Sequence, residues 1–435
     1  MRSGARNVRT EFTSAALTHF GGIFLLHSFL QCLKLRTYLA QRICYRDRNN
    51  RYTLSELLLA LIYPMILGLE NVEVSALLKT NGVFQYLTGL PSFPDPTTLR
   101  RFLIRATPTL LPELRNIHDL LRARFLILPT IPSSIWLDCD STVRTLFGHQ
   151  EGAEVGYNPT HRGKRSYHPL VIREAHREDL LGGLLRPGNA SSADGIQELI
   201  QEVVLLLPRS VEYRLRADAG FYDGDFVRFL KGKHISLVIV ADCTGPIKRR
   251  LSGLRYHRAS SDLAVSEFRY QPHGWDRKER FVVLRKKLPD DPAAPQGALL
   301  TLNRYAFRVL VTNLPLTPYG VFQFYDDHAG IERIIRTLKD DYPFARAATN
   351  NFEANALYAE ISLLAYNLMV WFKRLCLPGD WQSYTLPTIR HRLLMIPGQF
   401  TRSKNIPTLR FPRNNPYQDI FTFAQDRIKK LTPLV

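Results

Sequence analysis

Residues 213–242 read YRLRADAGFYDGDFVRFLKGKHISLVIVAD and decide the fold class. The residues at 213–218 predict a strand, and those at 220–233 predict a turn followed by a helix. The segment 235–242 is a nearly continuous apolar run, which is typical of a strand buried on both faces. A strand, a helix and a second strand in succession indicate an α/β layer.

Further β-type runs lie upstream of this unit. The run Ile135–Val143 is short and ends in acidic residues, and 166–172 and 180–188 predict two more strands. Between them and residue 213, the segment 192–207 places its apolar residues on one helical face. The alternation of strands and helices extends the α/β layer back to about residue 129.

Downstream of the same unit the helix signal disappears over 243–318, where aromatic and alternating segments predict strands on both sides of a Pro-rich loop at 288–297. From 321 the pattern is helical again. The predicted divisions are an N-terminal domain at 1–128, the first part of the core at 129–242, a β-rich insertion at 243–318, the second part of the core at 319–375, and a basic C-terminal region at 376–435.

The N-terminal domain is predicted to be all-α, because 13–125 carries apolar residues at helical spacing. Thr53 and Glu56 have the spacing of a capping box at a helix start. The apolar run 57–69 has 13 residues, which is too short to span a bilayer and predicts a buried helix.

The chain has 435 residues, a formal net charge of +19 and a pI near 9.8. The excess is spread along the chain, with +8 in 1–130, +5 in 131–350 and +6 in 351–435. Such a protein typically binds a polyanion, most often nucleic acid; the alternative is a basic enzyme whose charge only aids solubility. Arg100 and Arg101, on the exposed side of a predicted helix, are therefore either solvated or in contact with DNA.

The five cysteines are scattered and form no CxxC pair, so we expect neither a disulfide framework nor a structural zinc site. The N-terminus is basic and polar and does not have the pattern of a secretory signal. These features predict a reducing compartment and no membrane association.

Three acidic residues stand out by position. Asp140 and Asp218 each end a predicted strand, and Glu332 lies in a predicted helix. A carboxylate at a strand end of an α/β sheet faces the crevice where ligands bind. Each residue taken singly is more often a helix cap or a turn residue, so the argument rests on the combination.

The helix that carries Glu332 has an unusual face. Tyr325, His328, Glu332 and Lys339 stand at offsets 0, 3, 7 and 14. At about 100° per residue they fall within roughly 60° of one another. A face turned to the core would be apolar, so this pattern predicts a functional surface.

This face resembles the Y-x2-R-x3-E-x6-K signature of DDE-type insertion-sequence transposases, with His328 in the place of the arginine. LDCDST resembles their first-aspartate motif, and GHQEGAEVGYNPTHRGKRSYHPL resembles the segment that follows it. LRPGNASSADG and LRADAGFY resemble the segments before and around the second aspartate, and FPDPTTLRRFL resembles a helix start in their N-terminal domain. The resemblance covers roughly residues 20–420.

The resemblance implies an α/β catalytic core like that of ribonuclease H, interrupted by a β-rich insertion. Asp140, Asp218 and Glu332 become the catalytic, metal-binding triad. Asp138 competes with Asp140, but the family motif has a hydroxyl residue directly after the aspartate, which favours Asp140. The implied cofactor is Mg²⁺, with Mn²⁺ as a substitute, because carboxylates bind hard divalent cations and two such ions support phosphodiester chemistry.

The resemblance also implies contacts with DNA. Tyr325, His328 and Lys339 would position phosphates, although a neutral histidine cannot grip a phosphate as arginine does. Trp275, flanked by basic residues in the insertion, would stack on an unpaired base, or else form part of the sheet core. Further phosphate contacts are expected from one basic loop: Arg162, Lys164 and Arg165.

The implied function is a DNA transposase that binds the terminal inverted repeats of its element, cleaves there and transfers the strand to target DNA. A dimer on two paired DNA ends and a bacterial, cytoplasmic, nucleoid-associated location are expected. Two alternatives remain open. One is an inactive descendant that only binds DNA, which the histidine at 328 favours. The other is a metal-dependent nuclease without strand transfer.

Overall fold

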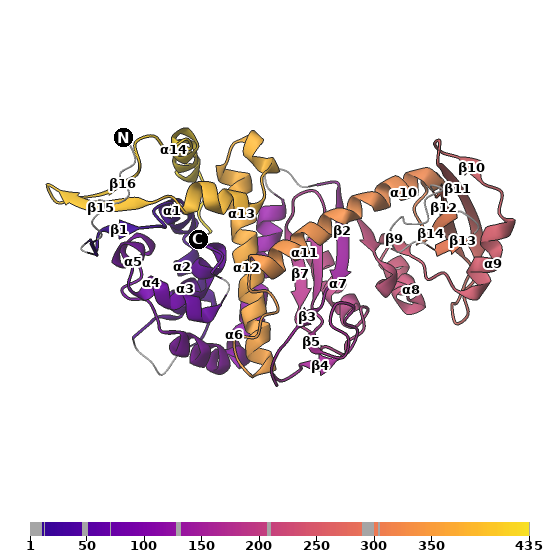
Figure 1. Ribbon diagram of the computed structural model, residues 1–435, viewed down its shortest axis with the longest axis horizontal. Helices are drawn as coiled ribbons and strands as arrows, with labels where there is room; N and C mark the ends of the chain where they lie inside the picture. The colour runs from indigo at the N-terminus through magenta and orange to yellow at the C-terminus, as the bar shows by residue number, and fades with distance from the viewer. Residues whose placement is uncertain are drawn as a thin grey trace, which may run out of the picture. The chain divides into compact units, whose positions relative to one another are not determined.

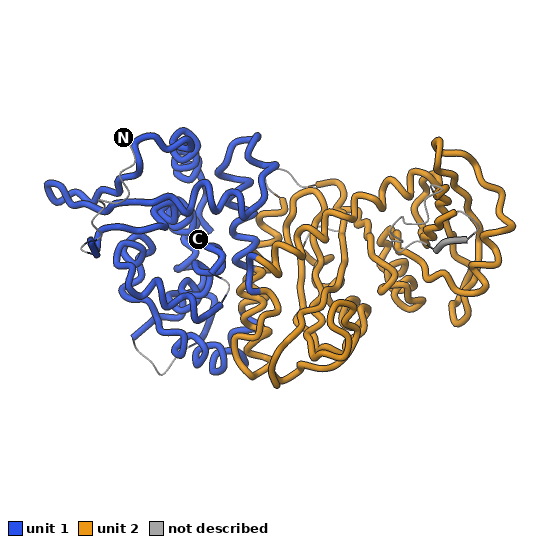
Figure 2. Tube along the Cα trace, viewed as in Figure 1, with its two compact units in different colours: residues 1–113, 341–343, 364–435 blue, residues 114–340, 344–363 orange. Residues whose placement is uncertain are grey.

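The computed structural model describes residues 11–12, 14–45, 51–69, 71–127, 132–206, 210–288, 300–302 and 305–434. The chain divides into two compact units (Figure 2). Unit 1 comprises residues 1–113, 341–343 and 364–435, and unit 2 comprises residues 114–340 and 344–363.

Unit 1 combines helices from both ends of the chain with a small sheet (Figure 1). Its N-terminal elements are β1 (Leu17–Thr18), α1 (Ile23–Cys32), α2 (Leu35–Arg42), α3 (Leu54–Ile66), the 3₁₀ turn η2 (Val72–Ser75), α4 (Ala76–Lys79), α5 (Gly82–Thr88) and the first part of α6 (Pro96–Leu126). Its C-terminal elements are the last part of α12 (Phe352–Cys376), η5 (Gly379–Ser383), α13 (Leu386–Ile389), η6 (Arg390–Leu394), β15 (Gly398–Ser403), β16 (Ile406–Arg410) and α14 (Gln418–Ile428).

The start of α3 follows from its sequence. The Thr53 hydroxyl accepts a hydrogen bond from the Glu56 backbone N–H, and the Glu56 carboxylate accepts one from the Thr53 backbone N–H, so the predicted capping box is present. The helix behind it is buried on nearly every side, as its apolar run predicts.

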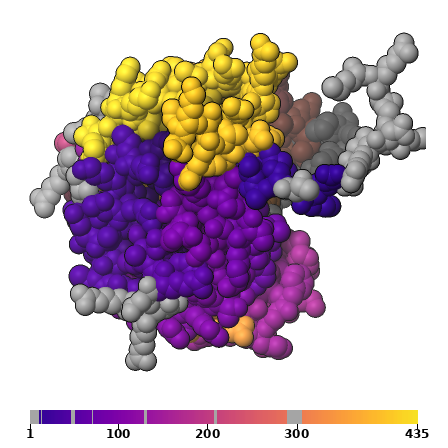
Figure 3. Space-filling model, turned by 90° about the vertical axis from the view of Figure 1, so that its left-hand side faces the viewer, coloured from indigo at the N-terminus to yellow at the C-terminus, as the bar shows by residue number. Residues whose placement is uncertain are grey.

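The expectation of an all-α N-terminal domain is not confirmed. β1 pairs antiparallel with β15, which in turn pairs with β16, so a C-terminal hairpin completes a three-stranded sheet with the N-terminal segment. The Cys32 thiol also donates to the carbonyl oxygen of Ile428. Figure 3 shows the C-terminal residues (yellow) packed directly on N-terminal ones (indigo). The two chain ends therefore share one unit.

Unit 2 is built on a ten-stranded mixed sheet in the order β10-β11-β12-β14-β9-β8-β2-β6-β7, with β13 beside β14. Its strands are β2 (Ser134–Ser141), β6 (Leu170–Glu174), β7 (Leu180–Leu184), β8 (Glu212–Ala217), β9 (Ser236–Val240), β10 (His257–Arg258), β11 (Leu263–Tyr270), β12 (Glu279–Lys287), β13 (Leu300–Leu302) and β14 (Tyr305–Thr312). The remaining elements are α7 (Ile196–Leu205), η3 (Ala219–Phe221), α8 (Gly224–Gly232), α9 (Gly245–Gly253), α10 (Pro318–Asp326), η4 (Asp327–Ala329), α11 (Gly330–Asp340) and a small sheet of β3 (Arg144–Thr145), β5 (Arg165–Tyr167) and β4 (Glu154–Val155).

The strand–helix–strand unit of residues 213–242 forms β8, α8 and β9, with the two strands parallel. β2 lies parallel to β8 on the other side, and β6 and β7 continue the sheet antiparallel. Side chains of β9 alternate between the two faces of the sheet. Leu237 and Ile239 join the core that includes α7 and α8, whereas Val238 joins the core that includes Phe322 and Phe324 of α10.

The predicted β-rich insertion continues the same sheet, because β14 pairs antiparallel with β9. The expectation that this segment contains no helix was wrong at α9. That helix buries only Ile247 and Leu251 and is otherwise polar, so it gives little periodic signal. Of the loop predicted at 288–297, all but Leu288 lies outside the described residues, as does the predicted boundary at 128. The four boundaries between the predicted divisions stay predictions.

Candidate active site

Asp138 and Asp140 stand two residues apart near the end of β2 and therefore point to the same face of the sheet. Asp138 is fully buried and neutralised. Its carboxylate pairs with Arg173 of β6 at 2.7 Å and with Arg216 of β8 at 2.6 Å, and His328 Nδ1 lies 3.2 Å from its Oδ1. Although burial disfavours its charge, the hydrogen bonds from His328 and Arg216 hold the pKa of Asp138 below its ordinary value.

Asp140 has the opposite surroundings. It is half-buried, and burial, together with the nearby carboxylates of Asp218 and Glu332, raises its pKa to about 7. The same strand thus carries one carboxylate that is fully neutralised and one that meets other carboxylates. Carboxylates gathered close together favour a bound cation, whereas a carboxylate that is already paired with two guanidinium groups does not.

The position of Glu332 follows from the spacing of strand and helix. Two residues of a strand span about 6.6 Å and four residues of a helix span about 6 Å. His328 contacts Asp138, and Glu332 follows four residues later in the chain. These spacings therefore bring Glu332 close to Asp140, which agrees with the contribution of Glu332 to the raised pKa of Asp140. Gly330 lies between His328 and Glu332 and lets this part of the chain pack closely on Arg173. A Cβ at position 330 would overlap the guanidinium of Arg173.

Asp218 directly follows β8 and caps the 3₁₀ turn η3. Its side chain accepts a hydrogen bond from the Gly220 backbone N–H at 3.0 Å. The alternative reading of Asp218 as a capping residue is therefore correct, but the capping bond uses only one carboxylate oxygen. The side chain of Asp218 is exposed and borders two cavities.

One cavity, of about 780 Å³, brings together four of the predicted residues. Asp218 lines it together with Tyr325, His328 and Glu332 of the predicted helical face. Burial raises the pKa of Tyr325 above its ordinary value, so the phenol stays protonated. The single helix predicted to carry this face is interrupted by η4, but the three side chains still share one cavity.

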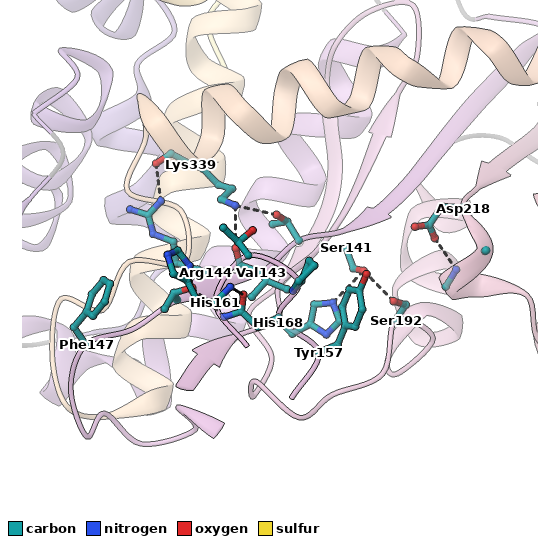
Figure 4. Close-up of a pocket in the computed structure, with 17 residues that line it drawn as sticks. Ser141, Val143, Arg144, Phe147, Tyr157, His161, His168, Ser192, Asp218 and Lys339 are labelled. Atoms are coloured by element: carbon teal, nitrogen blue, oxygen red, sulfur yellow. Dashed lines mark hydrogen bonds between the residues drawn. The ribbon is translucent and has the colours of Figure 1, made fainter. Parts of the chain in front are cut away.

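The second cavity, of about 700 Å³, also has Asp218 in its lining and is formed mainly by residues between 141 and 168 (Figure 4). Lys339 belongs here. Its ammonium donates to the Val143 carbonyl oxygen at 2.9 Å, and Arg144 donates to the Lys339 carbonyl oxygen at 3.0 Å. Burial, with a smaller effect of Arg144, lowers the pKa of Lys339. Ser141 connects the end of β2 to Ser192, 3.1 Å away, at the Asp218 end of the cavity.

Trp275 lies in the turn between β11 and β12, where it is partly buried. Its ring centroid is 5.1 Å from that of Tyr222, and a Cβ at Gly224 would press against its indole. The structure therefore packs Trp275 on the start of α8. Base stacking by this residue stays a prediction and would use only the exposed part of the ring.

None of the other predicted basic contacts lines either cavity. Arg162, Lys164 and Arg165 are exposed, and Arg165 is the first residue of β5. On α6, in unit 1, Arg101 is exposed, whereas Arg100 forms an ion pair with Glu73.

The residues that sequence reasoning missed are the two arginines that hold Asp138. Arg173 and Arg216 lie in strands that are buried on both faces, and each is at most 2% exposed. A charged residue inside an apolar strand signals a buried partner, because an unpaired buried charge is too costly to keep. That signal was present in the runs LVIRE and YRLRA.

Among the described residues, no three His, Cys, Asp or Glu side chains are close enough together to hold a metal ion. The five cysteines are all free. No helix within the described part of the chain is both long and apolar enough to cross a membrane.

The comparisons with known proteins bear on the whole chain. A structure described as "Cryo-EM structure of piggyBac transposase synaptic complex with hairpin DNA (SNHP)" is similar with a TM-score of 0.45 and 12% sequence identity, over 96% of this chain and 86% of that one. A search of curated proteins found no match. The profile of the family "Transposase DDE domain group 1" matches residues 2–433 and confirms the predicted DDE-type transposase. The chain belongs to the transposase DDE domain group 1 family.

Proposed function

We propose that Asp140, Asp218 and Glu332 form the metal-binding catalytic centre of an RNase H-like core. In this proposal the transposase uses the centre to hydrolyse a phosphodiester at each end of its element and to join the freed 3′ end to target DNA. Mg²⁺ is the proposed ion, with Mn²⁺ as a substitute, in line with the use of divalent metals by DDE transposases.

One observation carries the proposal: the contrast between the two aspartates of β2. Asp138 already has two guanidinium partners, so it has no remaining need of a cation. Among the described residues no guanidinium pairs with Asp140, and its pKa is raised to about 7 by burial and by Asp218 and Glu332. Like charges gathered in this way are stabilised by a divalent ion bound between them.

The donor set fits Mg²⁺ chemically, because this ion prefers carboxylate oxygens and completes its shell with water and phosphate oxygens. The described residues do not form a closed site, so we propose that DNA phosphates supply part of the coordination shell. Bound there, the ion would polarise the phosphodiester and lower the pKa of the attacking water.

The chain's own residues would position the DNA. Lys339 places a cation in the second cavity beside the end of β2, where it would attract the phosphate backbone. Tyr325, kept protonated, would donate a hydrogen bond in the first cavity. We propose that His328 orients Asp138 and does not grip a phosphate, because Arg173 and Arg216 already supply the positive charge at this position.

The proposal is tested with a duplex taken from the inverted repeat expected to flank the gene. The purified protein should nick this duplex in Mg²⁺ and then join its 3′ end to a second DNA, while EDTA should stop both steps. Asp140→Asn should lose both steps. Glu198→Gln, which removes an exposed carboxylate on α7, should keep them.

The alternatives give different results in the same assay. Nicking without joining would indicate a nuclease. Binding without nicking, unchanged by His328→Arg, would indicate an inactive DNA-binding protein. Pairing of two ends by a dimer would appear as a complex with two duplexes and two protein chains in sedimentation analysis.

A further inference from the structure

The hairpin of β15 and β16 in unit 1 is a two-stranded ribbon that extends beyond the helices of that unit (Figure 1). The turn residues Lys404 and Asn405 have φ values of 50° and 62°. Two successive residues with positive φ are typical of a type I′ turn, whose twist matches that of paired antiparallel strands. The hairpin is therefore a regular ribbon with a tight end.

One face of the ribbon packs against the N-terminal part of unit 1. The Phe400 ring centroid lies 4.6 Å from that of Tyr86, and the Phe400 backbone N–H donates to the Ala16 carbonyl oxygen at 2.8 Å. The guanidinium of Arg402 lies 5.6 Å from the Tyr86 ring centroid. These contacts fix the foot of the ribbon, whereas residues 402–407 are exposed.

The other face carries the side chains that alternate with Phe400 and Arg402. Ile406 on this face is 64% exposed. Arginine, glutamine, serine and threonine form hydrogen bonds with base edges, and apolar groups contact the thymine methyl. The residues of this face, in cross-strand pairs, are Gln399 with Arg410, Thr401 with Thr408, and Ser403 with Ile406.

The charge of the segment also fits DNA. No Asp or Glu occurs from 381 to 418. In the part of the chain that the structure describes, no carboxylate pairs with the cations of the hairpin region, which are Arg402, Lys404, Arg410 and Arg413. Unpaired exposed cations attract the phosphate backbone and release its counterions.

We propose that this ribbon enters the major groove of the element-end duplex and reads its sequence. The major groove, about 12 Å wide, admits a two-stranded β-ribbon. The inference goes beyond the proposed function, because it assigns sequence recognition to the C-terminal hairpin and is independent of the metal centre. In the alternative, the charges only protect the edge strand β16 from pairing with another chain.

The test compares Arg410→Ala, Lys404→Ala and the control Lys430→Ala, which removes an exposed cation elsewhere in unit 1. Fluorescence anisotropy measures binding to the inverted-repeat duplex and to a scrambled duplex, in EDTA and over a series of salt concentrations. Arg410→Ala should weaken binding to the specific duplex by roughly 10- to 100-fold and to the scrambled duplex far less. Lys404→Ala should weaken both alike and reduce the salt slope by about 1.

Equal behaviour of Arg410→Ala and Lys430→Ala, with circular dichroism unchanged, would overturn the proposal. Methylation interference tests the groove. Interference at guanine N7 is expected, and interference confined to adenine N3 would place the ribbon in the minor groove and contradict the assignment. Because binding is measured without metal, failure of the catalytic proposal would leave these results unchanged.

Discussion

Asp140→Asn should stabilise the metal-free protein, even though it removes a proposed catalytic group. In the folded protein, burial and the carboxylates of Asp218 and Glu332 raise the pKa of Asp140 from 3.8 to about 7. The difference of about three pKa units corresponds to at most about 4 kcal/mol, at about 1.4 kcal/mol for each unit. Asparagine has the same shape without the charge, so this destabilisation disappears.

The effect has a defined dependence on pH. A carboxylate whose pKa is raised by folding binds its proton more tightly in the folded state, so the protein loses stability as pH rises from about 4 to about 7. At pH 8 the whole loss is present in the metal-free wild type and absent in Asp140→Asn. At pH 5 the two proteins should differ much less.

The neighbouring substitution gives the opposite result. Asp138→Asn leaves the guanidinium groups of Arg173 and Arg216 buried without their counter-charge, which costs about 3–5 kcal/mol. Urea denaturation in EDTA, followed by circular dichroism, measures each free energy of unfolding at pH 5 and pH 8. Hydrogen exchange of peptides from β2 then compares the stability of unit 2 alone between the variants and the wild type.

Glu198→Gln is the matched control and should stay within about 0.5 kcal/mol of the wild type. Added Mg²⁺ should stabilise the wild type and not Asp140→Asn. The reasoning is refuted if Asp140→Asn is destabilised at pH 8, or if Asp138→Asn and Asp140→Asn lose stability alike.

Three further predictions concern unit 2. Glu360→Gln should lower the free energy of unfolding by about 3 kcal/mol, because its carboxylate lies 2.6 Å from His118 in a fully buried position; denaturation that matches the wild type would contradict this. Gly330→Ala should lower the free energy of unfolding by about 1–3 kcal/mol, because the added Cβ would displace Arg173. An unchanged melting curve would show that Gly330 and Arg173 are not tightly packed. Trp275→Ala should impair cleavage of the element end more than binding to it, and equal loss in both assays, or loss of the folded state, would count against base stacking.

The sequence alone was sufficient to predict the α/β core. Asp140, Asp218 and Glu332 stood out by their strand-end and helix positions, and Asp218 and Glu332 both act on the pKa of Asp140. Their assignment as a metal-binding triad came from the family resemblance and stays a prediction. The strand–helix–strand unit was readable because strongly apolar strands flank an amphipathic helix with a clear start. These features are local, so a single segment reveals them.

Features that depend on distant segments were not predictable. The role of Asp138 depends on Arg173 and Arg216, which lie 35 and 78 residues away along the chain. The participation of the C-terminal hairpin in a sheet with Leu17 and Thr18 also depends on tertiary packing. No periodicity within one segment encodes which remote strand it will pair with.

The central claim is that Asp140, Asp218 and Glu332 bind the catalytic metal. Titration of Mn²⁺ into the protein bound to its element-end duplex, followed by electron paramagnetic resonance, tests it most directly. The account predicts saturable binding that Asp140→Asn, Asp218→Asn and Glu332→Gln each weaken by at least about 100-fold, while Glu198→Gln binds as the wild type does. Unchanged Mn²⁺ binding in all three variants would contradict it.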